Sequence, residues 1–561
     1  MSPTPPEPAP GGGLPLPSSP GWRAPLLACV VFLAILAPYH DLVPFWDSRV
    51  YADCVVDAVG KGFDPLAFNC AGHPTALYMM LVGAGQRLAP GSTAALLAVN
   101  VLLGFLALFS FHRIALRLIP AGERASSLLP GLATLAFALH PVFLAGAAFL
   151  NPDYGVAVFF LAAAASLLEG RLALAVVAGT FAVWSKQPGV VVYTIVASLF
   201  ALSRLLGSEG PWRTVAASSR RLLWLALPTV SFGLYPVLKK SGLLGAAFYE
   251  TGGGQGLLAS ALTVGSHRVL LGYLVLIFVI NTSWLPTSIV LAGAAKRLVG
   301  GRLPTLHSFR ARLVASDVFR DRVVIAGTLL AATVVLTRFQ TYLNARYFLP
   351  LYPLLLLCAL VALQTLTGRR EIRIVVMGTV CVLFGLSISR TIDPVSRAIF
   401  GTFEFGDHRM LRMTSLTGEC CGYGRDQLVY SLEFAQFHYV LEGMLPALTA
   451  PSRPPVVVWP GLEWYFVGPL DKKTGRRTLR REGTVRLPMI SAIPVARGRI
   501  QLERFILLEF PNFAGESPLP YLLPLYQVEK ATSFGSSGYR ALAIEFARRP
   551  GAPGELAATA P

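Results

Sequence analysis

The residues of this chain that could do chemistry gather in short polar segments between long apolar runs. The first such segment, residues 40–75, contains five of the 14 acidic residues that precede residue 391. A connector between two hydrophobic helices does not require this concentration of carboxylates. A carboxylate such as Asp47 can take the proton of a hydroxyl nucleophile. The segment 40–75 is therefore where we expect chemistry to occur.

Polar side chains also stand at the ends of other apolar runs. A second carboxylate, Asp153, could hold a metal ion or orient Asp47. Cationic side chains offer donors for a phosphate leaving group, and the candidates are Lys186, Arg338 and Arg346. Each residue alone also suits a helix end at the headgroup layer, although ionisable groups at membrane depth are costly and often functional. Taken together, the set indicates a glycosyl transfer site with a lipid-phosphate donor.

The composition is that of a membrane protein. Of the 561 residues, 54% are hydrophobic and only 14% are charged, which is too apolar for a single soluble domain. We expect a surface or re-entrant helix at 74–90 and a tight outside turn at Lys186-Gln187-Pro188. Eleven apolar runs are long enough for membrane helices, at 23–40, 95–117, 127–149, 153–169, 172–186, 188–206, 222–239, 268–293, 323–338, 347–366 and 373–390.

The net charge of +18 comes mainly from short loops between these runs. This pattern is typical of topology determinants that face anionic membrane lipid, and it argues against a nucleic-acid partner. With a cytoplasmic N-terminus, the predicted inside loops hold 18 Lys and Arg, and the outside loops hold seven. The bias predicts that the candidate residues face the extracytoplasmic side of a bacterial-type inner membrane.

The chain divides into three predicted parts. Residues 1–22 are rich in Pro, Gly and Ser and are expected to form a disordered cytoplasmic tail. Residues 23–390 form the transmembrane domain, and 391–561, with 19 basic against 16 acidic residues, form a soluble domain outside the cytoplasm. Periodicity in this last part predicts strands at Val456–Trp459, Phe505–Phe510 and Ala541–Phe546 and a helix at Gln427–Leu445. The predicted fold is an α-helical polytopic membrane protein of about eleven transmembrane helices with a small C-terminal extracytoplasmic α/β domain.

The first polar segment contains residues with two interpretations that the sequence leaves open. Cys54 and Cys70 share this segment, where a disulfide could form. Asp53 and Asp57 would share one face of a helix that starts near Ser48, either as a second acidic site or as its solvated side.

Two histidines precede prolines. His73 could bind substrate or mark a helix start, and both interpretations stay open. The His140-Pro141 pair falls inside a predicted span, where packing or a kink is expected.

The order of these motifs resembles that of the C-type integral-membrane glycosyltransferases, the superfamily of the protein O-mannosyltransferases and the lipid A aminoarabinose transferase. Asp47-Ser48-Arg49-Val50-Tyr51 resembles the family's Asp-Glu motif, with Ser48 in place of Glu. Gly72-His73-Pro74-Thr75-Ala76-Leu77-Tyr78 resembles its His-Pro-Pro-Leu segment, with Thr75 in place of the second Pro. Asn151-Pro152-Asp153 resembles the acidic second outside loop, and Asn344-Ala345-Arg346-Tyr347-Phe348-Leu349-Pro350 resembles the Arg-Tyr-x-x-Pro start of a late span. The resemblance covers about residues 24–390.

The resemblance implies an inverting glycosyltransferase, a hexosyl- or pentosyltransferase. The sugar would move from a polyprenyl-phosphate-linked donor to a hydroxyl of a lipid, glycan or protein acceptor on the extracytoplasmic face. Asp47 would be the catalytic base, with Asp153 assisting it. The expected substrate-binding residues are Tyr51, His73, Lys186, Arg338, Arg346 and Tyr347. The cofactor is left open, with a divalent metal ion on Asp47 and Asp153 as one option.

Two other classes of function use similar architectures. A lipid-linked glycan transporter or flippase would place charged residues along a path through the membrane, whereas the candidates here gather at one predicted face. A polysaccharide polymerase or ligase would differ in whether one sugar or a whole glycan is transferred.

Overall fold

The computed structural model describes most of the helical part of the chain and a smaller share of the C-terminal part. The described residues are 22–42, 44, 47–70, 73–120, 128–207, 222–241, 267–300, 305–339, 344–388, 393–400, 402–405, 408–411, 453–458, 489–509, 518–535 and 541–552, with a few single residues between 432 and 448. The predictions of a disordered tail before Trp22 and of a helix at Gln427–Leu445 lie outside this set.

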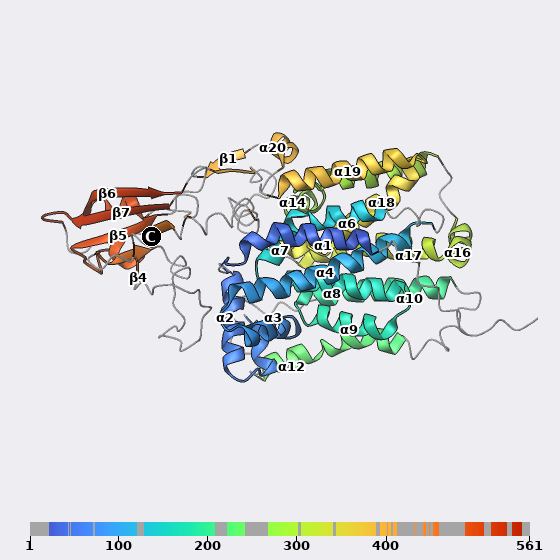
Figure 1. The fold of residues 1–561 in the computed structure, drawn as a ribbon, viewed down its shortest axis with the longest axis horizontal. Coiled ribbons are helices and arrows are strands. Elements are labelled where there is room, and N and C mark those ends of the chain that lie inside the picture. The colour runs from blue at the N-terminus through green and yellow to red at the C-terminus, as the bar shows by residue number, and fades with distance from the viewer. Residues whose placement is uncertain are drawn as a thin grey trace, which may run out of the picture.

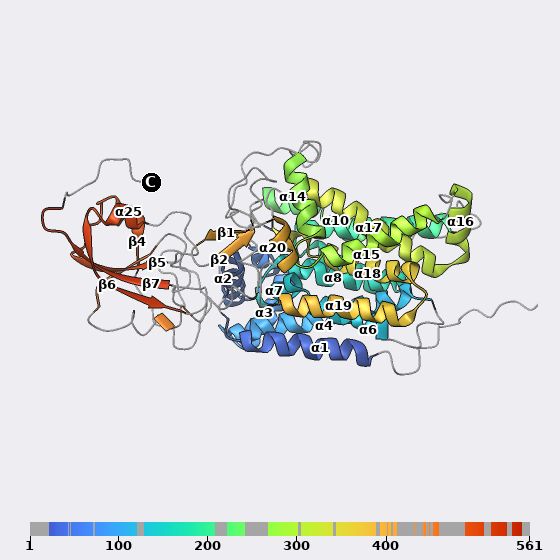
Figure 2. The same cartoon turned by 90° about the horizontal axis from the view of Figure 1, so that it is seen from above.

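Helices of 7 to 26 residues form a bundle, and most of them lie along the long axis of the molecule (Figures 1 and 2). In the described chain these are α1 (Arg23–Leu36), α4 (Thr93–Leu118), α6 (Leu128–Ala138), α7 (Pro141–Ala148), α8 (Pro152–Leu168), α9 (Leu172–Val183), α10 (Gln187–Leu206), α12 (Leu234–Lys240), α14 (His267–Phe278), α15 (Trp284–Val299), α17 (Asp317–Phe339), α18 (Leu351–Leu366) and α19 (Arg370–Ser387). Two further helices, α2 (Asp47–Gly60) and α3 (Ala76–Leu88), lie at the end of the bundle that faces the sheet, and α16 (Leu306–Ala315) lies at the opposite end (Figures 1 and 2). The helix expected within 74–90 is therefore present as α3.

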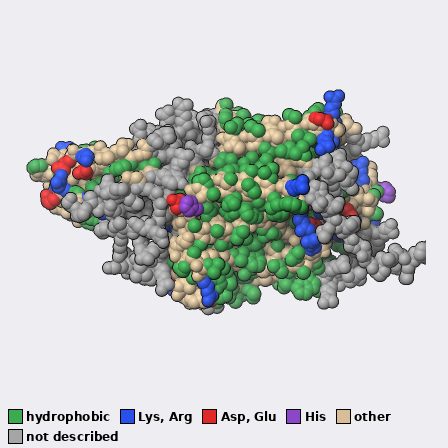
Figure 3. Space-filling view, viewed as in Figure 1, with side chains coloured by type: hydrophobic (Ala, Val, Ile, Leu, Met, Phe, Trp, Pro, Cys, Tyr) green, Lys and Arg blue, Asp and Glu red, His purple; other side chains and the backbone are tan. Residues whose placement is uncertain are grey.

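The opposite end of the bundle is tied together by charged side chains. Arg117 Nε lies 2.8 Å from the buried carboxylate of Asp321, which joins α4 to α17. Arg113 pairs with Glu169, which joins α4 to the end of α8. Hydrophobic side chains cover the middle of the helical part, and most of the Lys and Arg on the visible face of that part lie toward this end (Figure 3). The surface thus has the apolar band that a membrane requires.

The number of membrane spans remains a prediction. Among the described residues, two helices are long and apolar enough to cross a membrane, α4 with 26 residues and α10 with 20. The pair α6 and α7 would be a third if it is one span bent by 54°. The bend falls at His140-Pro141, as expected, because proline cannot donate the helical hydrogen bond. Other apolar helices are shorter, including the 17-residue α8 and the 12-residue α9.

Two more expected spans are wrong as continuous helices. The run 222–239 is divided into a helix at Leu222–Ser231 and α12. The apolar run 268–293 is divided into α14 and α15, because Asn281 and Thr282 have left-handed φ angles of 57° and 62°. The Asp393 carboxylate stabilises this break by accepting hydrogen bonds from Thr282 N at 3.1 Å and Trp284 Nε1 at 3.2 Å. The hydropathy of a run carries no signal for such a long-range acceptor.

A buried polar ladder fixes the helices beneath the end that carries α2 and α3. Tyr78 donates to Asn100 Oδ1 at 2.9 Å, and Asn100 Nδ2 donates to the carbonyl of Ala147 at 3.0 Å. Tyr154 donates to the Asn100 carbonyl at 2.8 Å. The side chains of Tyr78, Asn100 and Tyr154 are almost wholly buried, so the bonds connect α3, α4, α7 and α8 in an apolar setting.

The C-terminal part contains a five-stranded mixed sheet. Its strands are β3 (Val456–Val458), β4 (Met489–Ser491), β5 (Arg504–Glu509), β6 (Tyr526–Phe534) and β7 (Ala541–Arg548), in the order β4-β3-β5-β7-β6. Strand β3 pairs in parallel with β4 and β5, whereas β7 pairs antiparallel with β5 and β6. Short helices α24 (Ala492–Ala496) and α25 (Leu519–Leu522) pack on its apolar core. The small C-terminal sheet domain is thus confirmed. Strands β3, β5 and β7 correspond to the three that the sequence predicts, whereas β4 and β6 were not predicted.

The sheet lies beyond the same end of the bundle as α2 and α3 (Figures 1 and 2). Between it and α19 come α20 (Pro394–Phe400) and a hairpin of β1 (Thr402–Phe405) and β2 (His408–Leu411). The first polar segment and the C-terminal domain therefore share one end of the molecule, as their common assignment to the outside requires.

Candidate functional site

The first polar segment folds into α2, which begins at Asp47. The side chain of Asp47 lies outside the described residues, so its role as a base remains a prediction. Arg49 Nε lies 2.9 Å from Asp53 Oδ2, and Lys61 Nζ lies 2.7 Å from Asp57 Oδ2. Both acidic residues thus pair with a basic residue four positions away, which favours ion pairs over a second acidic site.

A disulfide closes this segment. Cys54 on α2 is bonded to Cys70, and their Cα atoms are 5.8 Å apart. Beside it, the buried Thr75 hydroxyl donates to the Phe68 carbonyl and accepts from Cys70 N, both at 2.8 Å. Thr75, the departure from the family's second proline, therefore holds the turn that leads from the disulfide through His73 into α3.

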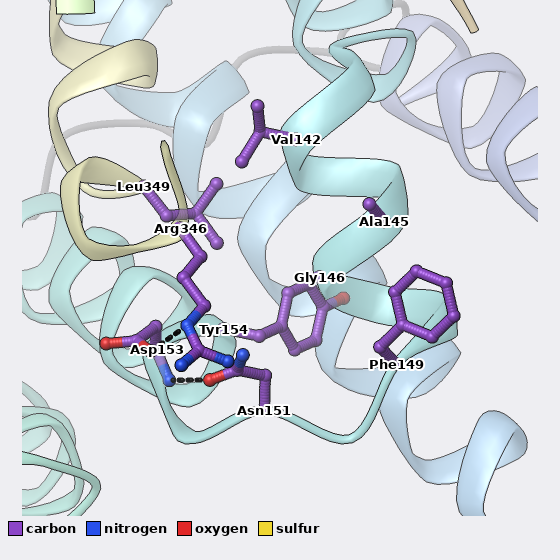
Figure 4. A pocket seen from close by; sticks show the side chains of 9 residues that line it. All are labelled: Val142, Ala145, Gly146, Phe149, Asn151, Asp153, Tyr154, Arg346 and Leu349. Carbon is purple, nitrogen blue, oxygen red and sulfur yellow. Dashed lines mark hydrogen bonds and ion pairs between the residues drawn. The ribbon is translucent and has the colours of Figure 1, made fainter. Parts of the chain in front are cut away.

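The centre of the candidate site is the buried carboxylate of Asp153 at the start of α8. Asn151 caps this helix, because its side chain accepts a hydrogen bond from Asp153 N at 3.1 Å. Lys186 Nζ lies 2.8 Å from Asp153 Oδ2, and Arg346 Nε lies 3.7 Å from the same oxygen. Arg346 points from its own segment toward Asp153 and Asn151 (Figure 4). Among the described side chains, two cations therefore meet one carboxylate.

Each of the three charged residues sits where a helix begins. Asp153 is in the first turn of α8, Lys186 immediately precedes α10, and Arg346 lies in the 3-10 turn Ala345–Phe348 before α18. Asn344 caps that turn by accepting from Arg346 N at 3.1 Å. Three helix starts thus point to one place in the structure. They begin with Asn151-Pro152 at α8, Gln187-Pro188 at α10 and Asn344-Ala345-Arg346 before α18.

Small residues let these helix starts approach their neighbours. A Cβ on Gly155 would lie 2.7 Å from the ring of Tyr78, and a Cβ on Gly189 would overlap the Ala182 carbonyl. Glycine at both positions allows α8 to pack on α3 and α10 to pack on α9. Asp153 and Lys186 are within two or three residues of these glycines, so the close packing sets their separation.

Tyrosines surround the two cations. Lys186 Nζ lies 4.7 Å and Arg346 Cζ lies 5.0 Å from the ring centre of Tyr347. Arg346 Nη2 also donates to the Tyr347 hydroxyl at 3.3 Å. The buried Tyr51 of α2 interacts electrostatically with Lys186. The structure thus brings Tyr51 and Tyr347 together with Asp153, as the sequence predicts.

His73 joins the cluster through a residue that sequence reasoning missed. Gln187 Nε2 is 3.1 Å from His73 Nδ1. Burial, together with the positive charge of Lys186, lowers the pKa of His73 to about 4, although Asp153 opposes the shift. His73 is therefore neutral near pH 7. The only sequence signal for Gln187 was its place next to Lys186 in the predicted turn.

Arg338 is the candidate that the structure does not join to the cluster. It lies in the last turn of α17 and forms no ion pair with any residue in the described ranges. The spacing of eight residues between Arg338 and Arg346 does not place their side chains together, because the helix ends between them.

A small cavity adjoins the charged residues. Its volume is about 10 Å³, which is room for about one water molecule. Its walls combine the polar groups of Asn151, Asp153 and Arg346 with apolar side chains (Figure 4). Those apolar side chains include Phe149 and Leu349. A sugar or phosphate therefore requires neighbouring side chains to move before it can enter.

The described residues contain no group of three or more His, Cys, Asp or Glu side chains that could hold a metal ion. Asp153 is already paired with Lys186 and approached by Arg346, so its charge is compensated. Two cationic side chains at one carboxylate suit an anion better than a divalent cation. The metal site considered for Asp47 and Asp153 thus gains no support from the described side chains.

The overall fold is similar to that of ArnT from Cupriavidus metallidurans, which agrees with the resemblance at the level of the fold. The crystal structure of ArnT from Cupriavidus metallidurans in the apo state matches with a TM-score of 0.52 and 16% identity, over 93% of this chain and 98% of that chain. The structure of the same protein bound to undecaprenyl phosphate gives 0.50 and 16%, over 94% and 98%. The apo oligosaccharyltransferase of Archaeoglobus fulgidus gives 0.42 and 11%, over 93% and 75%. No family model and no curated protein matches the sequence.

Proposed function

We propose that this protein is an inverting glycosyltransferase of the cell envelope, located in a bacterial-type inner membrane. It transfers a hexose or pentose from a polyprenyl-phosphate donor to a hydroxyl of a lipid, glycan or protein acceptor. The observation that carries the proposal is the buried cluster in which Lys186 and Arg346 meet Asp153. These two cationic side chains can donate charge-assisted hydrogen bonds to the phosphate of a lipid-linked donor.

In the proposed reaction, Asp47 removes the proton from the acceptor hydroxyl as the oxygen attacks the anomeric carbon. The bond between that carbon and the phosphate oxygen breaks, and the lipid phosphate leaves with the electron pair. Lys186 and Arg346 stabilise the charge that develops on the leaving phosphate. Asp153, which is buried between them, acts by holding these cations in place.

Two features support a donor that stays in the membrane. The cluster lies at helix starts and has an apolar wall on one side of its cavity. ArnT from Cupriavidus metallidurans, whose fold is similar, has been crystallised with bound undecaprenyl phosphate. We therefore propose undecaprenyl phosphate or a related polyprenyl phosphate as the carrier, and leave the sugar and acceptor to experiment.

We also propose that the cluster and the C-terminal sheet face the extracytoplasmic side. The charge bias of the loops supports this orientation, with 18 basic residues in the predicted inside loops against seven outside. The Cys54–Cys70 disulfide supports it independently, because disulfides persist in oxidising compartments.

The test measures two quantities on the purified protein, binding of undecaprenyl phosphate and transfer of sugar in membranes that contain donor and acceptor. Asp47→Asn should abolish transfer and leave lipid-phosphate binding intact. Lys186→Met should weaken binding more than tenfold. Lys61→Met is the control, because Lys61 is 64% exposed and pairs only with Asp57 on α2. Near-normal transfer by Asp47→Asn would refute the role of Asp47 as the catalytic base. Unchanged lipid-phosphate binding by Lys186→Met would refute the proposed phosphate site.

The same preparations separate the other classes of function. A transporter or flippase would move a lipid-linked sugar across vesicle membranes without forming a glycosidic bond. A polymerase or ligase would yield products that carry a whole glycan, which mass spectrometry distinguishes from single-sugar products. Either result would replace the proposed function.

A further inference from the structure

Gln187 links the charged cluster to a neighbouring helix. Its Nε2 lies 3.1 Å from His73 Nδ1, and its side chain is also hydrogen bonded to the hydroxyl of Tyr235 on α12. Tyr235 is buried and stacks on Phe232, with ring centres 5.1 Å apart. The position of the Gln187 amide is therefore fixed from two sides.

The hydrogen bond between Gln187 and His73 determines which imidazole nitrogen carries the proton. In the orientation that the structure gives the Gln187 amide, Nε2 is the donor and Nδ1 of His73 is the acceptor, which leaves Nδ1 without a proton. A neutral imidazole with a bare Nδ1 has its proton on Nε2. Within the described ranges, the hydrogen bond of His73 is the one at Nδ1, and none is formed at Nε2. This N–H is available to a ligand.

The charges around His73 favour the neutral ring. Lys186, beside Gln187, and Arg346, in the turn before α18, both oppose protonation, whereas Asp153 on α8 favours it. Burial and the positive charges of Lys186 and Arg346 together outweigh the effect of Asp153, so the pKa of His73 is lowered. A neutral N–H donor beside two cations suits an oxygen of a phosphosugar, because it adds a directed hydrogen bond to their charge.

We propose that Gln187 is a positioning residue that fixes His73 as the Nε2–H tautomer, so that His73 donates a hydrogen bond to an oxygen of the phosphosugar head group. The proposal rests on the proposed function for the identity of the ligand. His73 then acts as a fixed donor and not as the proton acceptor of the reaction. Gln187 acts on the substrate only through His73.

Nitrogen NMR of the full-length protein, labelled with ¹⁵N-histidine in lipid nanodiscs, tests the tautomer directly. His73→Asn identifies the signal of His73 among the eight histidines of the chain. At pH 7 the wild-type signal should show a proton on Nε2 alone. In Gln187→Glu, the carboxylate accepts a hydrogen bond, so Nδ1 should gain a proton. Gln364→Glu is the matched control, because Gln364 contacts Arg322 at the opposite end of the bundle, and it should leave the His73 signal unchanged.

A protonated Nδ1 in the wild-type protein, or an unchanged signal in Gln187→Glu, would overturn the proposal. A purely structural role for Gln187 would not move the proton from one nitrogen to the other. If Gln187→Glu fails to fold, Gln187→Met provides the second variant, since it keeps the volume and removes the donor. Its spectrum should then show both tautomers, and retention of Nε2–H alone would count against the proposal.

Activity separates this proposal from the proposed function. Gln187→Met should lower sugar transfer about tenfold, while its binding of undecaprenyl phosphate, measured with the pure lipid, should change less than threefold because Lys186 and Arg346 remain. Unchanged transfer would refute the role of His73 as a donor to substrate. Failure of the wild-type protein to bind the lipid would refute the proposed function instead, and the NMR result would still decide the tautomer.

Discussion

Loss of the Asp153 carboxylate should cost more stability than loss of any exposed charge in the protein. Lys186 Nζ lies 2.8 Å from Asp153 Oδ2, and the two side chains are only 8% and 3% exposed. At an effective dielectric constant of about 20, two unit charges at this distance attract each other by about 6 kcal/mol. Desolvation offsets several kcal/mol of that attraction, but Asp153→Asn removes the carboxylate that Lys186 and Arg346 share and leaves the Lys186 ammonium buried. We expect this variant to lose about 3–5 kcal/mol.

A double-mutant cycle isolates the interaction. Lys186→Met leaves Asp153 with Arg346 at 3.7 Å, so its cost should be smaller than that of Asp153→Asn. The double variant should be more stable than the sum of the single losses predicts, by at least about 2 kcal/mol. Reversible unfolding in mixed micelles, monitored by circular dichroism, gives the four free energies.

The chain offers a matched comparison on α2. Lys61 and Asp57 form the same type of pair at 2.7 Å, but Lys61 is 64% exposed. A cycle on this pair should give less than about 0.5 kcal/mol. The reasoning is refuted if the buried and exposed cycles give equal coupling energies, because burial would then have no effect on the strength of the ion pair.

Three further perturbations have expected outcomes. Asn100→Leu leaves Tyr78 and the Ala147 carbonyl without their buried partner, so the free energy of unfolding, measured by denaturant titration, should fall by about 2–5 kcal/mol. A decrease below about 1 kcal/mol would contradict the stabilising role of this hydrogen-bond ladder. Replacing Cys54 and Cys70 together by serine opens a loop with a sequence separation of 16. Hydrogen exchange of the amides in this loop should then show about 3 kcal/mol less protection. Equal protection would mean that the disulfide does not stabilise the loop. Because burial lowers the pKa of His73 to about 4, the unfolded chain binds a proton that the folded protein does not between about pH 6.5 and 4. Stability should fall as the pH falls through this window, and His73→Asn should reduce the slope of an unfolding titration; an unchanged slope would show that His73 does not contribute.

The sequence predicts the residues of the site better than it predicts their connections. Asp153, Lys186 and Arg346 are recognisable because each interrupts or borders an apolar run, where a charge is costly. Their shared location follows from the alternation of helix directions, which places every second loop at one end. Tyr51 and Tyr347 accompany them for the same reason.

Other features depend on contacts between distant parts of the chain. The division of 268–293 requires the Asp393 carboxylate, about a hundred residues further on, so no local pattern reveals it. The bond between Gln187 and His73 joins residues 114 positions apart. Arg338 and Arg346 look equivalent in the sequence, but Arg346, in the turn before α18, lies beside Asp153, whereas Arg338, in the last turn of α17, does not.

The ion pair between Arg113 and Glu169 places these two residues at the same height in the bundle, so the depth of Asp153 can be measured from them along α4 and α8. From Glu169 back to Asp153, α8 rises about 24 Å, whereas α4 rises about 30 Å from Arg113 to its first residue, Thr93. Along the helix axes, Asp153 therefore lies about 6 Å deeper in the bundle than Thr93, the first residue of α4. Under the proposed function, a lipid-borne donor would approach this depth from the side, with its chain among the acyl tails. An acceptor from the aqueous phase would have to extend its hydroxyl past the start of α4, so slender, flexible acceptors should reach the cluster more easily than broad, rigid ones.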